Sequence, residues 1–169
     1  AKEGVHDSYK NMAISLGQKL AGLGIDLVYG GAKIGLMGAI ADSVIKNGGN
    51  VIGIIPKQIL KLEVAHTGLS KLVKVDGMHE RKKAIYDYSD SFLALPGGFG
   101  TLDELFEVLT WNQLNIHKKP VYILNLNGFF DNLLLHLDHL VSEGFLAGSH
   151  RELVEVFSSV SDWEHNVIC

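Results

Sequence analysis

The chain has 169 residues, of which 47% are hydrophobic and 20% charged, and its formal net charge is -4. This length suits one domain with a substantial core, and the composition is globular rather than disordered. The mildly acidic balance argues against a general nucleic-acid binder. The single cysteine, Cys169, excludes an internal disulfide, no Cys/His spacing indicates zinc, and neither a signal peptide nor a membrane-spanning apolar run is evident. We expect a cytoplasmic protein.

Hydrophobic periodicity predicts helices that alternate with short apolar strands. The strands are apolar nearly throughout, which indicates burial on both faces, as in a parallel sheet. The prediction is one α/β domain over residues 1–169 with a doubly wound, mostly parallel, Rossmann-like sheet in three layers. In chain order, we predict a helix over 8–23, a strand over 25–29, a helix over 35–47, a strand over 51–55, a loop with a short helix over 57–71, a strand over 72–75, a helix over 78–89, a strand over 91–95, a helix from Thr101 to about Ile116, a strand over 121–124, a helix over 129–143, a short element over 152–157 and a peripheral tail from Ser158.

Helix stops and inward-facing side chains follow from the same pattern. Gly24 ends the first helix and Gly144 the helix over 129–143. Leu23 is expected on the inner face of the first helix, and Tyr88 on the inner face of the helix over 78–89.

The stretch Leu95–Glu104 reads Leu-Pro-Gly-Gly-Phe-Gly-Thr-Leu-Asp-Glu and follows a predicted buried strand. A strand, a glycine loop and a helix start bring bare backbone N–H groups and a positive helix end to an anion, most often a phosphate. A structural alternative is that Thr101 and Glu104 form a capping box. Capping does not require three glycines in the preceding four positions, so the glycine usage favours close approach of a ligand.

Two further segments are candidates for the same site. Gly30–Gly38 has neither dinucleotide-fingerprint nor Walker spacing, and the alternative is a tight strand-to-helix turn built from small residues. It follows the carboxyl end of a strand, as Leu95–Glu104 does, so both glycine segments are predicted to share one crevice. Met78–Lys83 presents Arg81 and Lys82 to a phosphorylated ligand, or is a solvated helix start. His66 and His79 lie near these segments and are assigned no chemistry.

These motifs resemble one known family. Residues 96–104 match P-G-G-x-G-T-x-x-E, residues 30–38 are similar to its upstream G-G-G-x-x-G-L-M-G segment, and residues 78–82 match M-H-x-R-K. The segments 110–114 and 117–120 continue the likeness. The sequence therefore resembles the Lonely Guy (LOG) family of cytokinin riboside 5'-monophosphate phosphoribohydrolases, many members of which are labelled lysine decarboxylases.

The resemblance implies a hydrolase of cytokinin biosynthesis that cleaves the N-glycosidic bond of cytokinin riboside 5'-monophosphate, of AMP, or of both. The products are the free base and ribose 5-phosphate. It implies no metal, no organic cofactor and a homodimer. Arg81 and Glu104 are then the catalytic pair, and Glu63 contacts the base side. The other implied substrate-binding residues are Gly30, Gly31, Met37, Lys82, Gly97, Gly98, Phe99, Gly100, Thr101, Leu102, Asp103 and Thr110.

Two departures and two alternative functions accompany the resemblance. Ala32 replaces the third glycine of the upstream loop, a mild change if its φ is negative. The family begins with an additional strand and a C-G-S-type loop that contributes to the phosphate pocket, and no such strand is expected between Ala1 and the helix predicted over 8–23. A nucleotide-binding or molybdenum-cofactor carrier protein on the same scaffold is the alternative function, and it does not need both Arg81 and Glu104. Lysine decarboxylation ranks last, because no pyridoxal-phosphate lysine context is evident.

Overall fold

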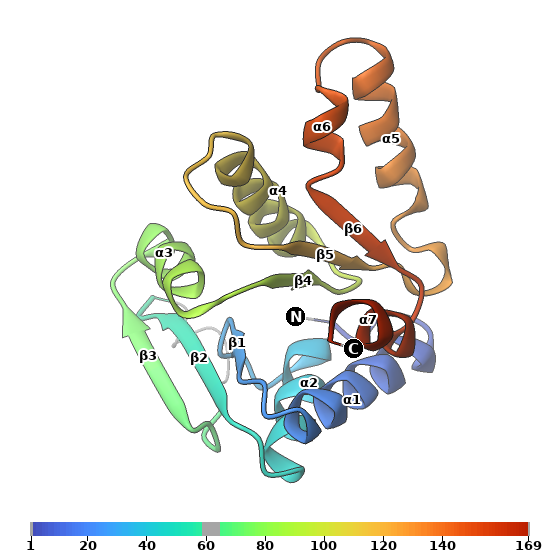
Figure 1. Ribbon diagram of the computed structural model, residues 1–169. Coiled ribbons are helices and arrows are strands. Elements are labelled where there is room, and N and C mark those ends of the chain that lie inside the picture. The colour runs from blue at the N-terminus through green and yellow to red at the C-terminus, as the bar shows by residue number, and fades with distance from the viewer. Residues whose placement is uncertain (1, 59–64, 169) are drawn as a thin grey trace. The chain divides into compact units, whose positions relative to one another are not determined.

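The computed structural model describes residues 2–58 and 65–168. The chain forms two compact units, residues 1–89 and 90–169, each built on a three-stranded parallel sheet (Figure 1). The first unit contains α1 (Asp7–Gly22), β1 (Leu27–Tyr29), α2 (Gly35–Lys46), β2 (Val51–Pro56), β3 (Lys71–Val75) and α3 (Met78–Tyr88). The second contains β4 (Phe92–Ala94), α4 (Phe99–Gln113), β5 (Val121–Leu124), the 3₁₀ turn η2 (Leu126–Gly128), α5 (Asp131–Ser142), α6 (Gly148–Arg151), β6 (Val154–Phe157) and α7 (Val160–Val167).

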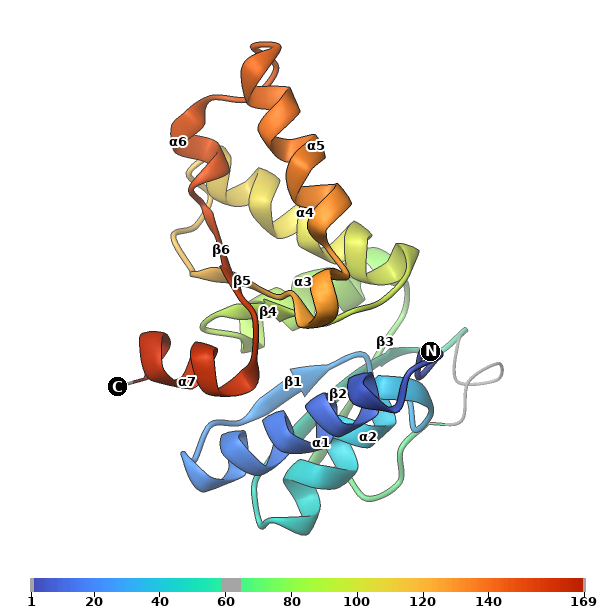
Figure 2. The ribbon, with the colours of Figure 1, turned by 90° about the vertical axis from the view of Figure 1, so that its right-hand side faces the viewer.

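In the first unit the strands pair in the order β1-β2-β3, with Leu27 opposite Val51 and Gly53 opposite Leu72. The helices α1 and α2 lie together on one face of this sheet and α3 on the other (Figures 1 and 2). Gly17 lets α1 and α2 approach closely, because a Cβ built on it would lie 2.8 Å from the backbone oxygen of Ile40. Burial of apolar side chains such as Leu16, Val44, Val51 and Ile54 stabilises the layers.

In the second unit the order is β4-β5-β6, and α4 and α5 lie side by side over one face (Figure 2). Their inward faces form a core with the strands, made of Leu105, Val108, Val121, Ile123, Phe130, Leu137 and Val154. Gly144, at a φ of +76°, ends α5 as predicted.

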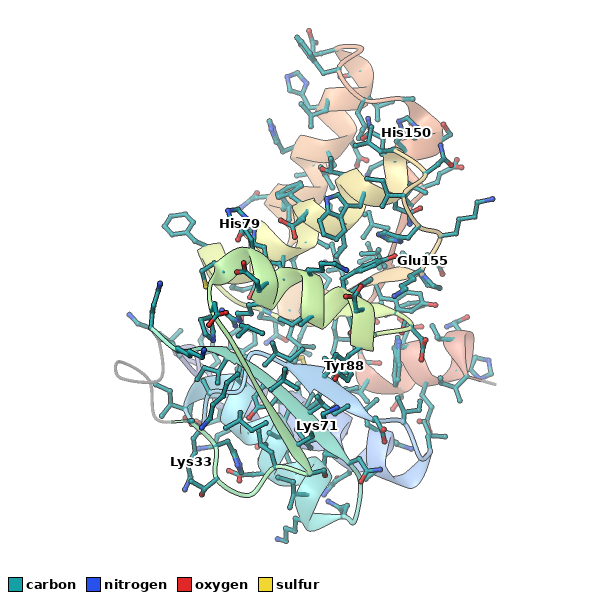
Figure 3. The ribbon with its side chains drawn as sticks, turned by 90° about the vertical axis from the view of Figure 1, so that its left-hand side faces the viewer. Lys33, Lys71, His79, Tyr88, His150 and Glu155 are labelled. Carbon is teal, nitrogen blue, oxygen red and sulfur yellow. The ribbon has the colours of Figure 1, made fainter. Side chains whose placement is uncertain are left out.

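The parallel α/β fold and the order of its elements confirm the sequence prediction. Four details differ. Leu23 is the C-cap of α1 and 40% exposed, and Gly24 then ends the helix in the left-handed conformation. Tyr88 is 42% exposed, because its hydroxyl accepts a hydrogen bond from Lys71 Nζ at the surface (Figure 3). The helix expected from Thr101 to about Ile116 spans 99–113 instead.

The fourth difference is the tail, which forms the helix α7 rather than a peripheral extension. Ser159 caps it by accepting a hydrogen bond from the Asp162 backbone N–H, and Trp163 is buried. Of the loop with a short helix predicted over 57–71, residues 57–58 and 65–70 contain no helix and Lys71 begins β3, while residues 59–64 lie outside the described residues. Among the described helices, none has the length and apolar character needed to cross a membrane.

Candidate functional site

Arg81 packs directly over the backbone of Gly30. Both follow the carboxyl ends of parallel strands, since Gly30 comes after β1 and Gly77, which precedes α3, comes just after β3. A Cβ built on Gly30 would overlap Arg81 Nη2 and lie 3.2 Å from Arg81 Cζ. Only glycine therefore leaves room for the guanidinium at this place, and the structure brings together two residues that the sequence assigned to the site separately.

Two methionines flank this arginine. Arg81 Nη1 lies 3.9 Å from Met78 Sδ, and a Cβ on Gly30 would lie 3.3 Å from Met37 Sδ. Arg81 Nε is buried and has no hydrogen-bond partner among the described residues. A thioether is a weak acceptor, so the guanidinium keeps hydrogen-bonding capacity for an oxyanion. Met78 was not singled out from the sequence, although its i, i+3 spacing to Arg81 places the two side chains on one helix face.

At two other positions of the upstream loop, Gly31 and Gly38, packing or backbone conformation within the first unit requires a glycine. Gly31 has a φ of +79°, and a Cβ there would lie 3.3 Å from Ile55 Cβ. A Cβ on Gly38 would overlap the carbonyl of Lys33. Ala32 is fully buried and does not adopt a positive φ, so its replacement of glycine is mild, as expected. The tight-turn alternative thus accounts for Gly31 and Gly38, whereas Gly30 serves Arg81.

In the second unit α4 begins earlier than predicted, directly after Gly97 and Gly98 and with Gly100 inside it. Gly98 is the N-cap with an extended backbone, and its carbonyl accepts the first intrahelical bond, from the Leu102 N–H. Thr101 is therefore the third helical residue rather than the N-cap, and the predicted capping box with Glu104 is wrong. A glycine N-cap has no side-chain oxygen to offer, so Gly98 itself satisfies none of the first N–H groups of α4 with a side chain.

The glycines of this loop divide into two kinds. A Cβ on Gly97 would overlap the Thr101 hydroxyl, so Gly97 makes room for that side chain. At Gly98 and Gly100 a Cβ would meet no atom of the described chain within 4 Å, apart from chain neighbours and the helix backbone, and neither residue has a positive φ. Internal packing and backbone conformation therefore do not explain why these two positions are glycine.

Glu104 lies one turn beyond Gly100 on α4, with Thr101 on the same face. Residues one turn apart share a helix face, so Glu104 lies on the same face of α4 as the bare backbone of Gly100. Thr110 does not join this group. It lies about 16 Å along the axis from the helix start, and its hydroxyl donates to the Phe106 carbonyl.

The predicted site residues thus fall into separate sets. Gly30, Gly31, Met37, Arg81 and Lys82 belong to the first unit, while Gly97, Gly98, Phe99, Gly100, Thr101, Leu102, Asp103 and Glu104 form one contiguous group in the second. Glu63 lies outside the described residues. The shared crevice of the two glycine loops remains a prediction. Within residues 2–58 and 65–168, no three His, Cys, Asp or Glu side chains gather where they can hold a metal ion.

Fold and loops together define a Rossmann-like α/β protein with glycine-rich loops after the carboxyl ends of parallel strands. The profile of the family described as "Possible lysine decarboxylase" matches residues 37–166. Over 147 residues the chain is 50% identical to the rice cytokinin riboside 5'-monophosphate phosphoribohydrolase LOG and 48% identical to LOG1 of Arabidopsis thaliana. Each match covers 87% of this chain, but only 61% of the rice protein and 69% of LOG1. The chain belongs to the LOG family.

Solved structures are similar at lower sequence identity. The molybdenum cofactor binding protein of Rippkaea orientalis is 25% identical, with a TM-score of 0.70 over 98% of this chain and 89% of that one. The Moco carrier protein of Chlamydomonas reinhardtii is 23% identical, with a TM-score of 0.71 over the same shares. The second likeness establishes the shared fold alone.

Proposed function

We propose that the chain hydrolyses the N-glycosidic bond of a nucleoside 5'-monophosphate, either AMP or a cytokinin riboside 5'-monophosphate, to the free base and ribose 5-phosphate. One observation carries the proposal: Gly98 and Gly100 leave bare backbone at an uncapped helix start, one turn before Glu104. A phosphate fits such a helix start, and a carboxylate one turn away can reach the attached ribose. The names of relatives at 50% and 48% identity supply the substrate class.

Cleavage of this bond builds positive charge on the ribose ring in an oxocarbenium-like transition state. Glu104 stabilises that charge and orients the attacking water. Water adds to C1' as the bond to the base nitrogen breaks, and the base leaves with a proton. Arg81, whose Nε is without a protein partner among the described residues, binds an oxygen of the phosphate or ribose. The helix start at Gly98 holds the 5'-phosphate, so binding energy far from the bond positions the reaction.

The alternative is a nucleotide-binding or molybdenum-cofactor carrier protein without hydrolase activity. The Rippkaea orientalis protein is named a molybdenum cofactor binding protein. That relative shares 25% identity, whereas the phosphoribohydrolases share about twice as much. A carrier has no need of a carboxylate one turn beyond the helix start, so the presence of Glu104 there favours the hydrolase.

The test is direct. Purified full-length protein is incubated with AMP and with isopentenyladenosine monophosphate in a chelator, and the free base is followed by chromatography. We expect release of adenine, of isopentenyladenine, or of both, without added metal or cofactor. Binding of both nucleotides with no base released from either refutes the hydrolase and supports the carrier.

The wider proposal is a single cytoplasmic nucleotide-binding domain that forms a homodimer. On α4, Phe99 and Phe106 are 92% and 38% exposed and lie on one helix face, seven residues apart. Such exposed aromatic side chains are typical of surfaces that bind another protein. The mass in solution, measured by light scattering during gel filtration, should be twice that of the chain; a monomeric mass contradicts the dimer.

A further inference from the structure

His66 is a buried polar side chain for which the proposed chemistry has no use. It is 5% exposed, and both ring nitrogens are engaged within the first unit. Nδ1 accepts a hydrogen bond from the Gly68 backbone N–H at 3.1 Å, and Nε2 lies 2.9 Å from Asp42 Oδ1 on α2. Since Nδ1 is an acceptor, the ring proton is on Nε2, which donates to Asp42. The ring therefore ties the turn 66–68 to the helix that follows the upstream glycine loop.

The backbone of the same segment binds the glycine loop itself. His66 N–H donates to the Gly31 carbonyl at 3.0 Å, and Ala65 forms an antiparallel bridge with Ala32. The Gly30–Ala32 loop is thus bound by residues 65–66. The His66 ring in turn binds Asp42 on α2. Burial, and to a smaller extent the nearby Asp42 charge, raise the pKa of Tyr29, the residue before Gly30.

The loop held in this way is the surface against which Arg81 rests. Gly31 is fastened by His66, and its neighbour Gly30 lies under the guanidinium so closely that a Cβ would overlap Nη2. A shift of the loop by a fraction of an ångström therefore moves the contact that orients Arg81. We propose that His66 and Asp42 are positioning residues, which hold the Gly30–Ala32 loop in the place that aligns Arg81 with the anionic part of the substrate.

This inference rests on the proposed function, because it assigns a consequence for the binding of a nucleoside monophosphate. A buried histidine that only stabilised the unit would affect unfolding without any specific effect on substrate affinity. If His66 and Asp42 position the loop, loss of the hydrogen bond between them should raise KM for AMP. The value of kcat should stay nearly unchanged, since Glu104 lies on a different element.

The experiment compares three variants of the full chain. Asp42→Ala removes the acceptor of the His66 ring; its side chain is 63% exposed, so the substitution leaves no buried cavity. Asp42→Asn keeps an acceptor oxygen at the same place. Asp26→Ala is the control, an exposed aspartate before β1 at the end of the strand opposite the glycine loop. Steady-state kinetics with AMP, amide hydrogen exchange at His66 and Gly68, and thermal unfolding are measured on each.

For Asp42→Ala we expect faster exchange of both amides and an increase in KM of about fivefold, the usual effect of one lost hydrogen bond, with kcat within about twofold of wild type. Asp42→Asn should restore most of the KM, and Asp26→Ala should behave as wild type. If amide hydrogen exchange at His66 and Gly68 is unchanged in Asp42→Ala, the hydrogen bond between His66 and Asp42 does not hold this segment in place. Faster exchange with unchanged KM overturns the role in substrate positioning. If the wild-type chain releases no base, the proposed function fails, while the exchange rates still decide whether Asp42 and His66 hold the loop.

Discussion

At the level of single residues, Glu104 is the side chain on which the proposed chemistry depends most. Glu104→Gln keeps the size and shape of the side chain but removes the negative charge that stabilises an oxocarbenium-like ribose. We expect turnover to fall about 100-fold or more, the usual contribution of an acid–base group, while the dissociation constant for AMP stays nearly unchanged. Calorimetric titration and single-turnover base release measure the two quantities. Glu107→Gln, on the next turn of α4, is the control, and a fully active Glu104→Gln would show that this carboxylate is not the working group.

Gly30 tests the position of Arg81. Gly30→Ala inserts a methyl group where the guanidinium now lies, so Arg81 must move away from the loop. Because charge-assisted hydrogen bonds are strong and depend on geometry, we expect KM for AMP to rise about tenfold. Gly22→Ala at the end of α1 is the matched control, since a Cβ there meets nothing within 4 Å in the described chain. A wild-type KM for Gly30→Ala would contradict the role of Arg81 in binding AMP.

At the level of elements, the start of α4 separates stability from function. Gly100 is the second residue of the helix, where alanine is intrinsically better and where a Cβ clashes with nothing in the described chain. We expect Gly100→Ala to raise the free energy of unfolding by about 0.5–1 kcal/mol and yet to weaken AMP binding, because the methyl group occupies the ligand's approach to the backbone. Urea unfolding and calorimetric titration measure the two effects. Gly148→Ala, at the first residue of α6, should leave AMP binding unchanged; unchanged binding by Gly100→Ala itself would remove the main support for the phosphate site.

Most helices and strands could be predicted from hydrophobic period and glycine stops, and the errors have identifiable causes. The start of α4 was placed two residues late because glycines were taken to lie outside the helix, whereas Gly100 is inside it. The helix α7 was missed because its inward side chains, Val160 and Trp163, are too few to establish a period. Tyr88 was expected inside from its place in the helical pattern, but its hydroxyl accepts a hydrogen bond from Lys71 at the surface.

At the level of the whole molecule, sequence motifs indicate the segments of the candidate site but not the contacts within the folded chain. Gly30 and Arg81 meet because two parallel strands end at the same edge of a sheet, and no local pattern reports how close they come. The tie between His66 and Asp42 was missed for the same reason, since an isolated histidine carries no spacing signal. A local sequence pattern is enough to identify each segment. The packing of the Arg81 guanidinium over Gly30, in contrast, depends on how the whole first unit folds.

The stability of the whole chain should depend on pH through one buried histidine. His117 is 7% exposed; its Nε2–H donates to the Val108 carbonyl and its Nδ1 accepts from the Lys119 N–H. Burial lowers the pKa of His117 below its ordinary value of 6.5. The unfolded chain therefore takes up a proton at His117 at a higher pH than the folded chain does. Stability is complete above about pH 6.5 and falls as the pH drops below it, by at most about 1.4 kcal/mol per pH unit, until the folded pKa is reached.

The variant His117→Gln isolates this contribution, because a glutamine amide can donate to Val108 and accept from Lys119 but takes up no proton. We expect its free energy of unfolding in urea to change less between pH 7.5 and pH 5.5 than that of the wild type. His79→Gln, at an exposed site on α3, is the control and should keep the wild-type slope (Figure 3). Equal slopes for wild type and His117→Gln would place the acid sensitivity elsewhere, whereas a flatter slope for His117→Gln alone would show that the junction between α4 and β5 depends on a histidine that must stay neutral.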